Sequence, residues 1–94
     1  MSYRVVLQPR AKESLRKCSR LLRLKVADRL QFLAESPASL SRGASFPHPA
    51  DSQVYEFDVD DPFCSGRWHH FAVFFRYGQD EQTISVIAIG HTPL

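Results

Sequence analysis

Three side chains that can do chemistry stand in the second half of the chain, namely Trp68, His70 and His91. An indole offers a flat surface on which a nucleic-acid base can stack. An imidazole titrates near neutral pH, so it can move the proton of a ribose 2′-hydroxyl or stabilise charge on a phosphate. These residue types fit a nucleic-acid site if the fold brings them together.

Two strands that carry these residues are expected to form a hairpin. Residues 67–77 are rich in aromatic side chains, and residues 82–90 are rich in β-branched ones. A turn at residues 78–81 would pair Tyr77 with Gln82, and a short turn of this kind fixes the register of the whole hairpin.

Two different faces follow from that register. The apolar face, suited to packing against helices, is expected to hold Phe71, Val73, Phe75, Tyr77, Ile84, Val86 and Ala88. The other face is expected to hold Trp68, His70, Ala72, Phe74, Arg76, Thr83, Ser85, Ile87, Ile89 and His91. Trp68 and the two histidines gather at one end of it, whereas Arg76 lies about 27 Å away at ~3.3 Å per residue. An ordinary sheet face with polar edge residues is the alternative interpretation.

The elements that position this hairpin begin with a strand and a helical hairpin. Residues 2–8 alternate in polarity, as a strand does, and residues 10–36 carry an apolar stripe at helical spacing that ends before Pro37. One helix of that length would span about 40 Å at 1.5 Å per residue, which is long for so small a domain. We therefore expect a break at residues 18–20.

A loop and a further strand complete the expected fold. Residues 36–52 concentrate Ser, Pro, Gly and Ala and are expected to form an irregular loop, and residues 53–59 alternate as a strand. The 94 residues are enough for one domain, spanning 1–94. The order predicts an α+β fold with an N-terminal strand, a helical hairpin and a three-stranded antiparallel meander.

Charge is divided along the chain although the net charge is only +2. Residues 1–47 hold ten Lys and Arg against three acids, and residues 48–94 hold two Arg against seven acids. Such asymmetry favours a polyanionic partner, although a solvated helix surface gives the same pattern. Cations of the expected helices and loop are candidates for phosphate contact: Arg16, Arg20, Arg23 and Arg42.

Cysteine usage and hydropathy exclude several classes. Cys18 and Cys64 are expected to be reduced thiols, with Cys18 in the core, because two isolated cysteines form no disulfide framework. The His and Cys residues lack the spacing of a metal site, so neither a metal nor another cofactor is expected. No apolar run is long enough to cross a membrane and no signal peptide is evident, so a cytoplasmic protein is expected.

Two segments resemble the RelE/ParE superfamily of toxins from type II toxin–antitoxin pairs. The stretch LQPRAKESLRK (7–17) is similar to the family's strand-to-helix junction. The stretch RWHHFAVFFRYGQDEQTISVIAIGH (67–91) is similar to its closing hairpin. The resemblance spans nearly the whole chain, and it implies a βααβββ fold and a cognate antitoxin as partner.

For the RelE-like branch, the resemblance implies a ribosome-dependent endonuclease that cuts messenger RNA by attack of the 2′-hydroxyl, without a metal. His70 and His91 would then share the acid–base work, and Arg67 would contact the phosphate. Other RNA contacts would come from Trp68, Arg76, Arg42, Arg16, Arg20 and Arg23.

Two alternatives stay open within the resemblance. ParE-like members inhibit DNA gyrase, which would be the partner in place of the ribosome. No lysine occurs after Lys25, so basic residues that could clamp a phosphate are sparse in the second half of the chain. A catalytically decayed member acting as a binding module is the other alternative.

Overall fold

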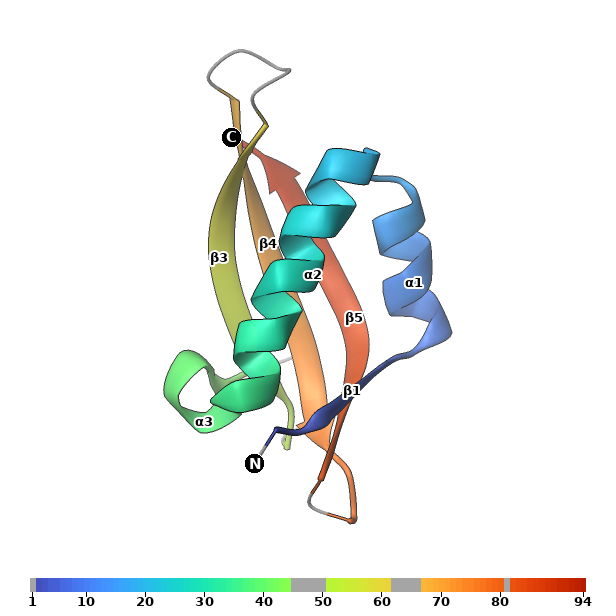
Figure 1. Cartoon of the computed structure of the whole chain (residues 1–94), viewed down its shortest axis with the longest axis vertical. Helices are drawn as coiled ribbons and strands as arrows, with labels where there is room; N and C mark the ends of the chain where they lie inside the picture. The colour runs from blue at the N-terminus through green and yellow to red at the C-terminus, as the bar shows by residue number, and fades with distance from the viewer. Residues whose placement is uncertain (1, 45–50, 62–66, 81) are drawn as a thin grey trace.

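The computed structural model describes residues 2–44, 51–61, 67–80 and 82–94. Within these residues five strands form one sheet in the order β1-β5-β4-β3-β2, and α1 and α2 lie on one of its faces (Figure 1). The elements are β1 (Arg4–Leu7), α1 (Pro9–Arg16), α2 (Arg20–Glu35), α3 (Pro37–Leu40), β2 (Arg42–Gly43), β3 (Gln53–Asp61), β4 (Arg67–Tyr77) and β5 (Thr83–Pro93). This order confirms the predicted α+β fold.

The helical hairpin has the predicted break. Pro9 begins α1, where its missing N–H leaves no bond unmade, and residues 17–19 separate α1 from α2. Ser19 caps α2, because its hydroxyl accepts a hydrogen bond from the Leu22 N–H at 3.3 Å. The predicted apolar stripe of α2 is buried against the sheet: Leu22, Val26, Leu30 and Leu33.

The Ser19 cap gives a prediction for stability. Ser19→Ala is expected to lower the free energy of unfolding by about 1 kcal/mol, because one N–H at the start of α2 loses its acceptor. Urea unfolding followed by circular dichroism measures the change. Ser14→Ala is the matched control, since the Ser14 hydroxyl only donates to the Arg10 carbonyl within α1 at 3.3 Å. Equal losses in both variants would contradict a capping role.

The region predicted as a loop, residues 36–52, contains two short elements. Pro37 begins the single-turn helix α3, and β2 pairs with β3 in an antiparallel register, with Arg42 opposite Val54. His48 lies outside the described residues. The loop is thus more regular than predicted, and it sets Arg42 beside the sheet.

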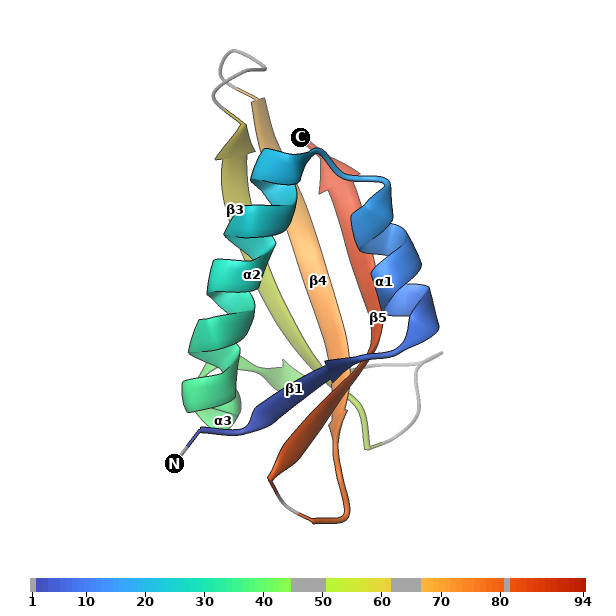
Figure 2. The same cartoon turned by 45° about the vertical axis from the view of Figure 1, so that its right-hand side comes forward.

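The first strand pairs with the last. β1 runs parallel to β5, with Arg4 opposite Thr83, and therefore lies at one edge of the sheet (Figure 2). The side chains of Tyr3, Val5 and Leu7 are partly buried against the core. The sequence predicts the strand but not its partner, because residues 2–8 alternate in the same way whatever strand lies beside them.

The turn between β4 and β5 is shifted from the predicted one. Tyr77 pairs with Ile84 rather than with Gln82. The Gly78 N–H donates to the Thr83 carbonyl at 2.7 Å, so the loop lies between these two residues. Near the turn, β5 is therefore shifted by two residues relative to the predicted register. Because side chains alternate along a strand, an even shift leaves each residue of β5 on its predicted face of the sheet.

A β-bulge then reverses the faces of the distal half of β5. The register changes between Phe74 and Phe75, which adds one residue to β5. Since side chains alternate along a strand, one extra residue exchanges the two faces from the bulge onward. His91 therefore pairs with Phe71 on the side of the helices, where Ile89 is also buried. The predicted faces of three residues are wrong: Ala88, Ile89 and His91.

The core lies between the sheet and the helical hairpin. The strand residues with no exposed surface are the predicted Phe71, Val73, Phe75, Ile84 and Val86. Cys18 belongs to the same core, as predicted, and is 7% exposed. Cys64 lies outside the described residues.

Candidate functional site

The face of the sheet that points away from α1 and α2 carries several of the predicted site residues. Trp68, His70 and Arg76 lie on it, because they alternate along β4 with the buried Phe71 and Phe75. Trp68 is half exposed and His70 is partly exposed. We call this surface the open face.

His70 forms the centre of the open face together with Asp58 of β3. The two residues are directly opposite in the β3–β4 register, and His70 Nδ1 lies 2.7 Å from Asp58 Oδ1. A carboxylate at this distance accepts the Nδ1–H, so the neutral ring presents an unprotonated Nε2. A carboxylate that orients an imidazole in this way prepares it to act as a general base.

Two small residues of the open face, Ala72 and Gly90, lie next to His70 in β4 and β5. Gly90 pairs with Ala72, and a Cβ added to Gly90 would meet the Ala72 Cβ at 3.7 Å. Small side chains in both strands leave room for a planar group to approach His70 from solvent. Trp68 precedes His70 by two residues on the same face, so a base could stack on it.

Two arginines of the open face are held by carboxylates. Arg42 lies 3.2 Å from Glu56, which is two residues from Asp58 on the same face of β3. Arg76 lies 2.6 Å from Asp51, and this hydrogen-bonded ion pair lowers the pKa of the Asp51 carboxyl. Arg42 thus reaches the residue next to Asp58 on the same face of β3, while Arg76 lies six residues beyond His70 along β4.

The remaining predicted cations lie elsewhere. Arg67 is the exposed first residue of β4, next to Trp68. Arg16 forms an ion pair with Glu13 at 3.1 Å, and Arg23 donates to the Cys18 carbonyl at 3.2 Å. Arg16, Arg20 and Arg23 belong to helices on the other side of the sheet, so they cannot contact a phosphate that His70 contacts (Figure 2).

His91 does not share the site of His70. Its Nε2 lies 2.8 Å from His69 Nδ1, and its ring stacks on Phe71 with 4.6 Å between ring centroids. The Cys18 thiol lies 4.0 Å from His91 Nδ1. The prediction that His70 and His91 act on the same group is wrong, because the bulge puts them on opposite faces.

The surroundings of His91 are expected to make the stability of the fold depend on pH. Burial, with a further contribution from His69, lowers the pKa of His91 below its ordinary value of 6.5. The unfolded chain therefore binds a proton more readily than the folded one, so this contribution to stability is complete above pH 6.5 and is lost as the pH falls. Urea unfolding at a series of pH values should show this loss in the wild-type chain and a weaker one in His91→Phe. An equal acid dependence in both chains would contradict the assignment.

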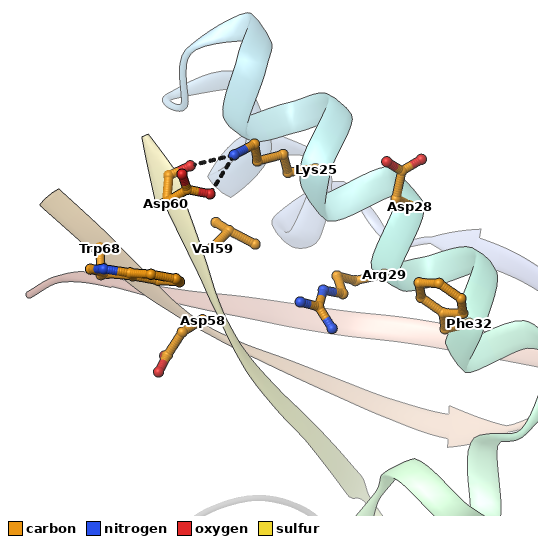
Figure 3. Close-up of a pocket in the computed structure, with 8 residues that line it drawn as sticks. All are labelled: Lys25, Asp28, Arg29, Phe32, Asp58, Val59, Asp60 and Trp68. Carbon is orange, nitrogen blue, oxygen red and sulfur yellow. Dashed lines mark hydrogen bonds and ion pairs between the residues drawn. The ribbon is translucent and has the colours of Figure 1, made fainter. Parts of the chain in front are cut away.

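A groove runs between α2 and β3 on the flank of the molecule (Figure 3). It has a volume of about 410 Å³, and Lys25, Arg29, Phe32, Asp58, Asp60 and Trp68 are among the residues that line it. Lys25 crosses it to Asp60, donating to the carboxylate at 2.6 Å and to the backbone carbonyl at 2.7 Å. The bond to Lys25 lowers the pKa of the Asp60 carboxyl. We call this feature the α2–β3 groove.

Sequence reasoning missed Asp58, Glu56 and the α2–β3 groove. The alternation of aromatic and acidic residues over 53–59 was visible, but pairing Asp58 with His70 requires the register across residues 62–66. Among the described residues no group of three His, Cys, Asp or Glu side chains is placed to hold a metal ion. No helix in the described part is long and apolar enough to cross a membrane.

Comparison with known proteins gives a consistent picture of the fold. No family model and no curated protein matches the chain. Among solved structures, the RelBE2 toxin–antitoxin complex from Mycobacterium tuberculosis matches with a TM-score of 0.72 at 14% identity, covering 98% of this chain and 100% of that chain. A mutant of the E. coli toxin RelE in the free state matches with a TM-score of 0.63 at 18% identity, covering 96% of this chain and 83% of that one.

A third structure agrees with these two. The intact E. coli RelBE toxin–antitoxin complex matches with a TM-score of 0.61 at 20% identity, covering 95% of each chain. At sequence identities this low, structural similarity establishes a shared fold but not a shared activity. The expected family architecture is thereby confirmed: the chain has the fold of the RelE toxins.

Proposed function

We propose that this chain is the toxin of a type II toxin–antitoxin pair and that it cuts messenger RNA on the ribosome at the open face. The observation that carries the proposal is the pairing of His70 with Asp58 at 2.7 Å, next to the exposed Trp68. The fold supports it, because the similar structures are toxins or toxin–antitoxin complexes by their own description. The cognate antitoxin is the proposed partner, and the cytoplasm is the proposed location.

The reaction follows from the orientation of His70. Its Nε2 accepts the proton of a ribose 2′-hydroxyl, the 2′-oxygen attacks the adjacent phosphorus, and the bond from phosphorus to the 5′-oxygen breaks. The products are a 2′,3′-cyclic phosphate and a 5′-hydroxyl; solvent water supplies the proton of the 5′-hydroxyl, and His70 later returns the proton it accepted to solvent. The nucleophile belongs to the RNA itself, so the step needs no metal-bound water.

Neighbouring residues have distinct parts in this proposal. Asp58 holds the Nδ1–H of His70, so that Nε2 is the nitrogen that accepts the proton, and Asp58 stabilises the imidazolium that forms, while Trp68 stacks a base. Arg42 and Arg67 contact phosphate, Arg42 by exchanging its Glu56 partner for a phosphate whose negative charge grows in the transition state. Arg76 extends the contact along the RNA.

Induced expression in bacteria tests the proposal, with growth, RNA integrity and DNA damage scored together. We expect arrested growth and cleaved messenger RNA, with intact DNA. Co-expression of the antitoxin should restore growth. Unbroken messenger RNA in arrested cells would contradict the nuclease, and harmless expression would favour the binding-module alternative.

A second candidate function rests on the helices. The exposed Arg16, Arg20 and Arg23 lie on or beside α1 and α2, away from the open face, and could bind a target such as DNA gyrase. In that case induction stalls DNA cleavage complexes and leaves messenger RNA intact. Replacing the three arginines with glutamate should then abolish toxicity, while His70→Ala should leave it unchanged.

A further inference from the structure

The lining of the α2–β3 groove suits a small uncharged group better than a phosphate. Its volume of about 410 Å³ lies within the roughly 300–1,000 Å³ of small-molecule sites. Three carboxylates line it against two cations, namely Asp28, Asp58 and Asp60 against Lys25 and Arg29. This excess of negative charge repels an anion, so the groove favours a neutral ligand that donates hydrogen bonds.

Trp68 provides a surface on which a planar ring can stack. Its side chain is 51% exposed and lines the groove at the border of the open face. Trp68 is directly opposite Asp60 in the β3–β4 register, and Figure 3 shows the indole beside the Asp60 carboxylate. A ring stacked on the indole therefore has one edge next to this carboxylate. Every nucleobase has a face that can stack, so stacking alone does not select among bases.

The ion pair with Lys25 holds the Asp60 carboxylate in place. Lys25 donates to Oδ1 and to the backbone carbonyl of Asp60. No other residue in the described part of the chain donates to Oδ2. An ionised carboxylate only accepts hydrogen bonds, and each of its oxygens has two lone pairs. Asp60 thus presents a fixed pair of acceptors to a ligand in the groove.

Arg29 presents donors from the wall that α2 forms. Its guanidinium lies 5.6 Å from the centroid of the Phe57 ring, and its side chain extends from α2 towards β3 (Figure 3). No carboxylate of the described residues forms an ion pair with it. A guanidinium has parallel N–H groups that match two neighbouring acceptors on one ligand. The groove therefore combines acceptors on β3 with a donor pair on α2.

Guanine is the nucleobase whose two edges match these groups. Its N1–H and its N2 amino group are adjacent donors that one carboxylate can accept, and its O6 and N7 are adjacent acceptors that one arginine can bind. Adenine would direct an unprotonated N1 at the carboxylate and an amino group at the arginine. The pyrimidines have no N7. The groove thus selects against the other three bases as well as for guanine.

We propose that the α2–β3 groove binds a guanine base, which stacks on Trp68, donates to Asp60 and accepts from Arg29. The base belongs either to RNA bound at the open face or to a free guanine nucleotide. In the first case a guanosine lies beside the bond that His70 cleaves, and this consequence rests on the proposed function. Binding of the base itself does not depend on cleavage.

Fluorescence of the full chain tests the proposal, because Trp68 is its only tryptophan. Guanosine 5′-monophosphate should quench the emission and bind about ten- to hundredfold more tightly than the adenosine, cytidine or uridine monophosphates. Inosine monophosphate lacks the N2 amino group, and 7-deazaguanosine monophosphate lacks the N7 acceptor. Each should bind about tenfold more weakly than the guanosine nucleotide, since each loses one hydrogen bond to a charged group.

Matched variants assign each edge of the base to its residue. Asp60→Asn should abolish the preference for guanosine over inosine, and Arg29→Gln should abolish the preference for guanosine over 7-deazaguanosine. Asp28→Asn is the control for charge, because the Asp28 carboxylate lines the groove but points away from β3 (Figure 3). Arg10→Gln is the control for Arg29, since Arg10 is exposed on α1 and does not line the groove. Both controls should keep both preferences.

A trinucleotide with a central guanosine distinguishes the two sources of the base. It is made with 2′-deoxyribose, so it has no 2′-hydroxyl and cannot be cleaved by the proposed reaction. Tighter binding than that of guanosine monophosphate, lost in Arg67→Gln, identifies nucleic acid as the source, because the flanking phosphates then contact the open face. Equal or weaker binding identifies a free nucleotide.

The outcomes separate this proposal from the nuclease. Equal affinity for the four monophosphates, or unchanged preferences in both Asp60→Asn and Arg29→Gln, would overturn the guanine site. His70→Ala should lose cleavage and still bind guanosine monophosphate with the wild-type preference. Cleavage without guanine binding means that the groove assignment has failed, and guanine binding without cleavage in the wild-type chain means that the nuclease proposal has failed.

Discussion

His70→Ala is expected to slow RNA cleavage by about 10²- to 10⁴-fold, the range that a positioned general base contributes. The alanine has no group to accept the 2′-hydroxyl proton, while Asp58 and Trp68 stay in place. Cleavage of messenger RNA on purified ribosomes measures the rate. Growth inhibition on induction should fall with it.

Two further variants make this prediction specific. Asp58→Asn should reduce cleavage less than His70→Ala, and it should alter the pH profile, because the amide can hold His70 Nδ1 in the wrong protonation state. His91→Phe should leave cleavage nearly unchanged, since His91 lies on the opposite face of the sheet. Full activity in His70→Ala would contradict the site at the open face.

The largest expected loss of stability comes from the centre of the core. Phe75→Ala should lower the free energy of unfolding by about 3–5 kcal/mol, because Phe75 has no exposed surface and its removal leaves a cavity between sheet and helices. Urea unfolding measures the loss. In so small a domain this is a large share of the total stability, so part of the variant should be unfolded in mild denaturant.

Phe32→Ala is the chemically matched control for Phe75→Ala. The same atoms are removed from a side chain that is 55% exposed, so the expected change is within about 0.5 kcal/mol. A similar loss in both variants would mean that the two rings are buried to a similar degree in solution. That result would contradict the packing of α2 described above.

The helices could be predicted from the sequence because their signals are local. Pro9 marks the start of α1, and the spacing of Leu22, Val26 and Leu30 sets the buried side of α2. The break before Ser19 followed from length alone, and the structure shows the cap that fixes it. Such features depend on residues within a few positions of each other.

The placement of His91 could not be predicted in the same way. The turn beyond Tyr77 and the bulge beside Phe74 together move the register by an odd number of residues. A bulge is a tertiary compromise that buries Ile89, and the β-branched run of β5 gives no sign of where it occurs. The one extra residue that the bulge adds to β5 places His91 on the opposite face of the sheet from His70.

The pairing of His70 with Asp58 also depends on strand register, which short-range sequence patterns do not determine. Their alignment is set by the β3–β4 register, and the residues that join these strands carry no signal that fixes it. The predicted involvement of His70 therefore stays a prediction about its role, while its position on the open face agrees with the alternation along β4. Arg42 lies on the open face because it belongs to β2, a strand that was not predicted from the sequence.

The parallel pairing of β1 with β5 has a consequence for the order in which the chain can fold. Arg4 is opposite Thr83, so a strand made early in translation must wait for one made much later before the sheet is complete. Contacts between residues so far apart in sequence slow folding, because the intervening chain must be ordered first. During synthesis Val5 and Leu7 lack their final packing against β5, and the nascent chain exposes them. The interval before β5 emerges is therefore a period in which a chaperone or a binding partner can engage the nascent chain before its sheet is complete.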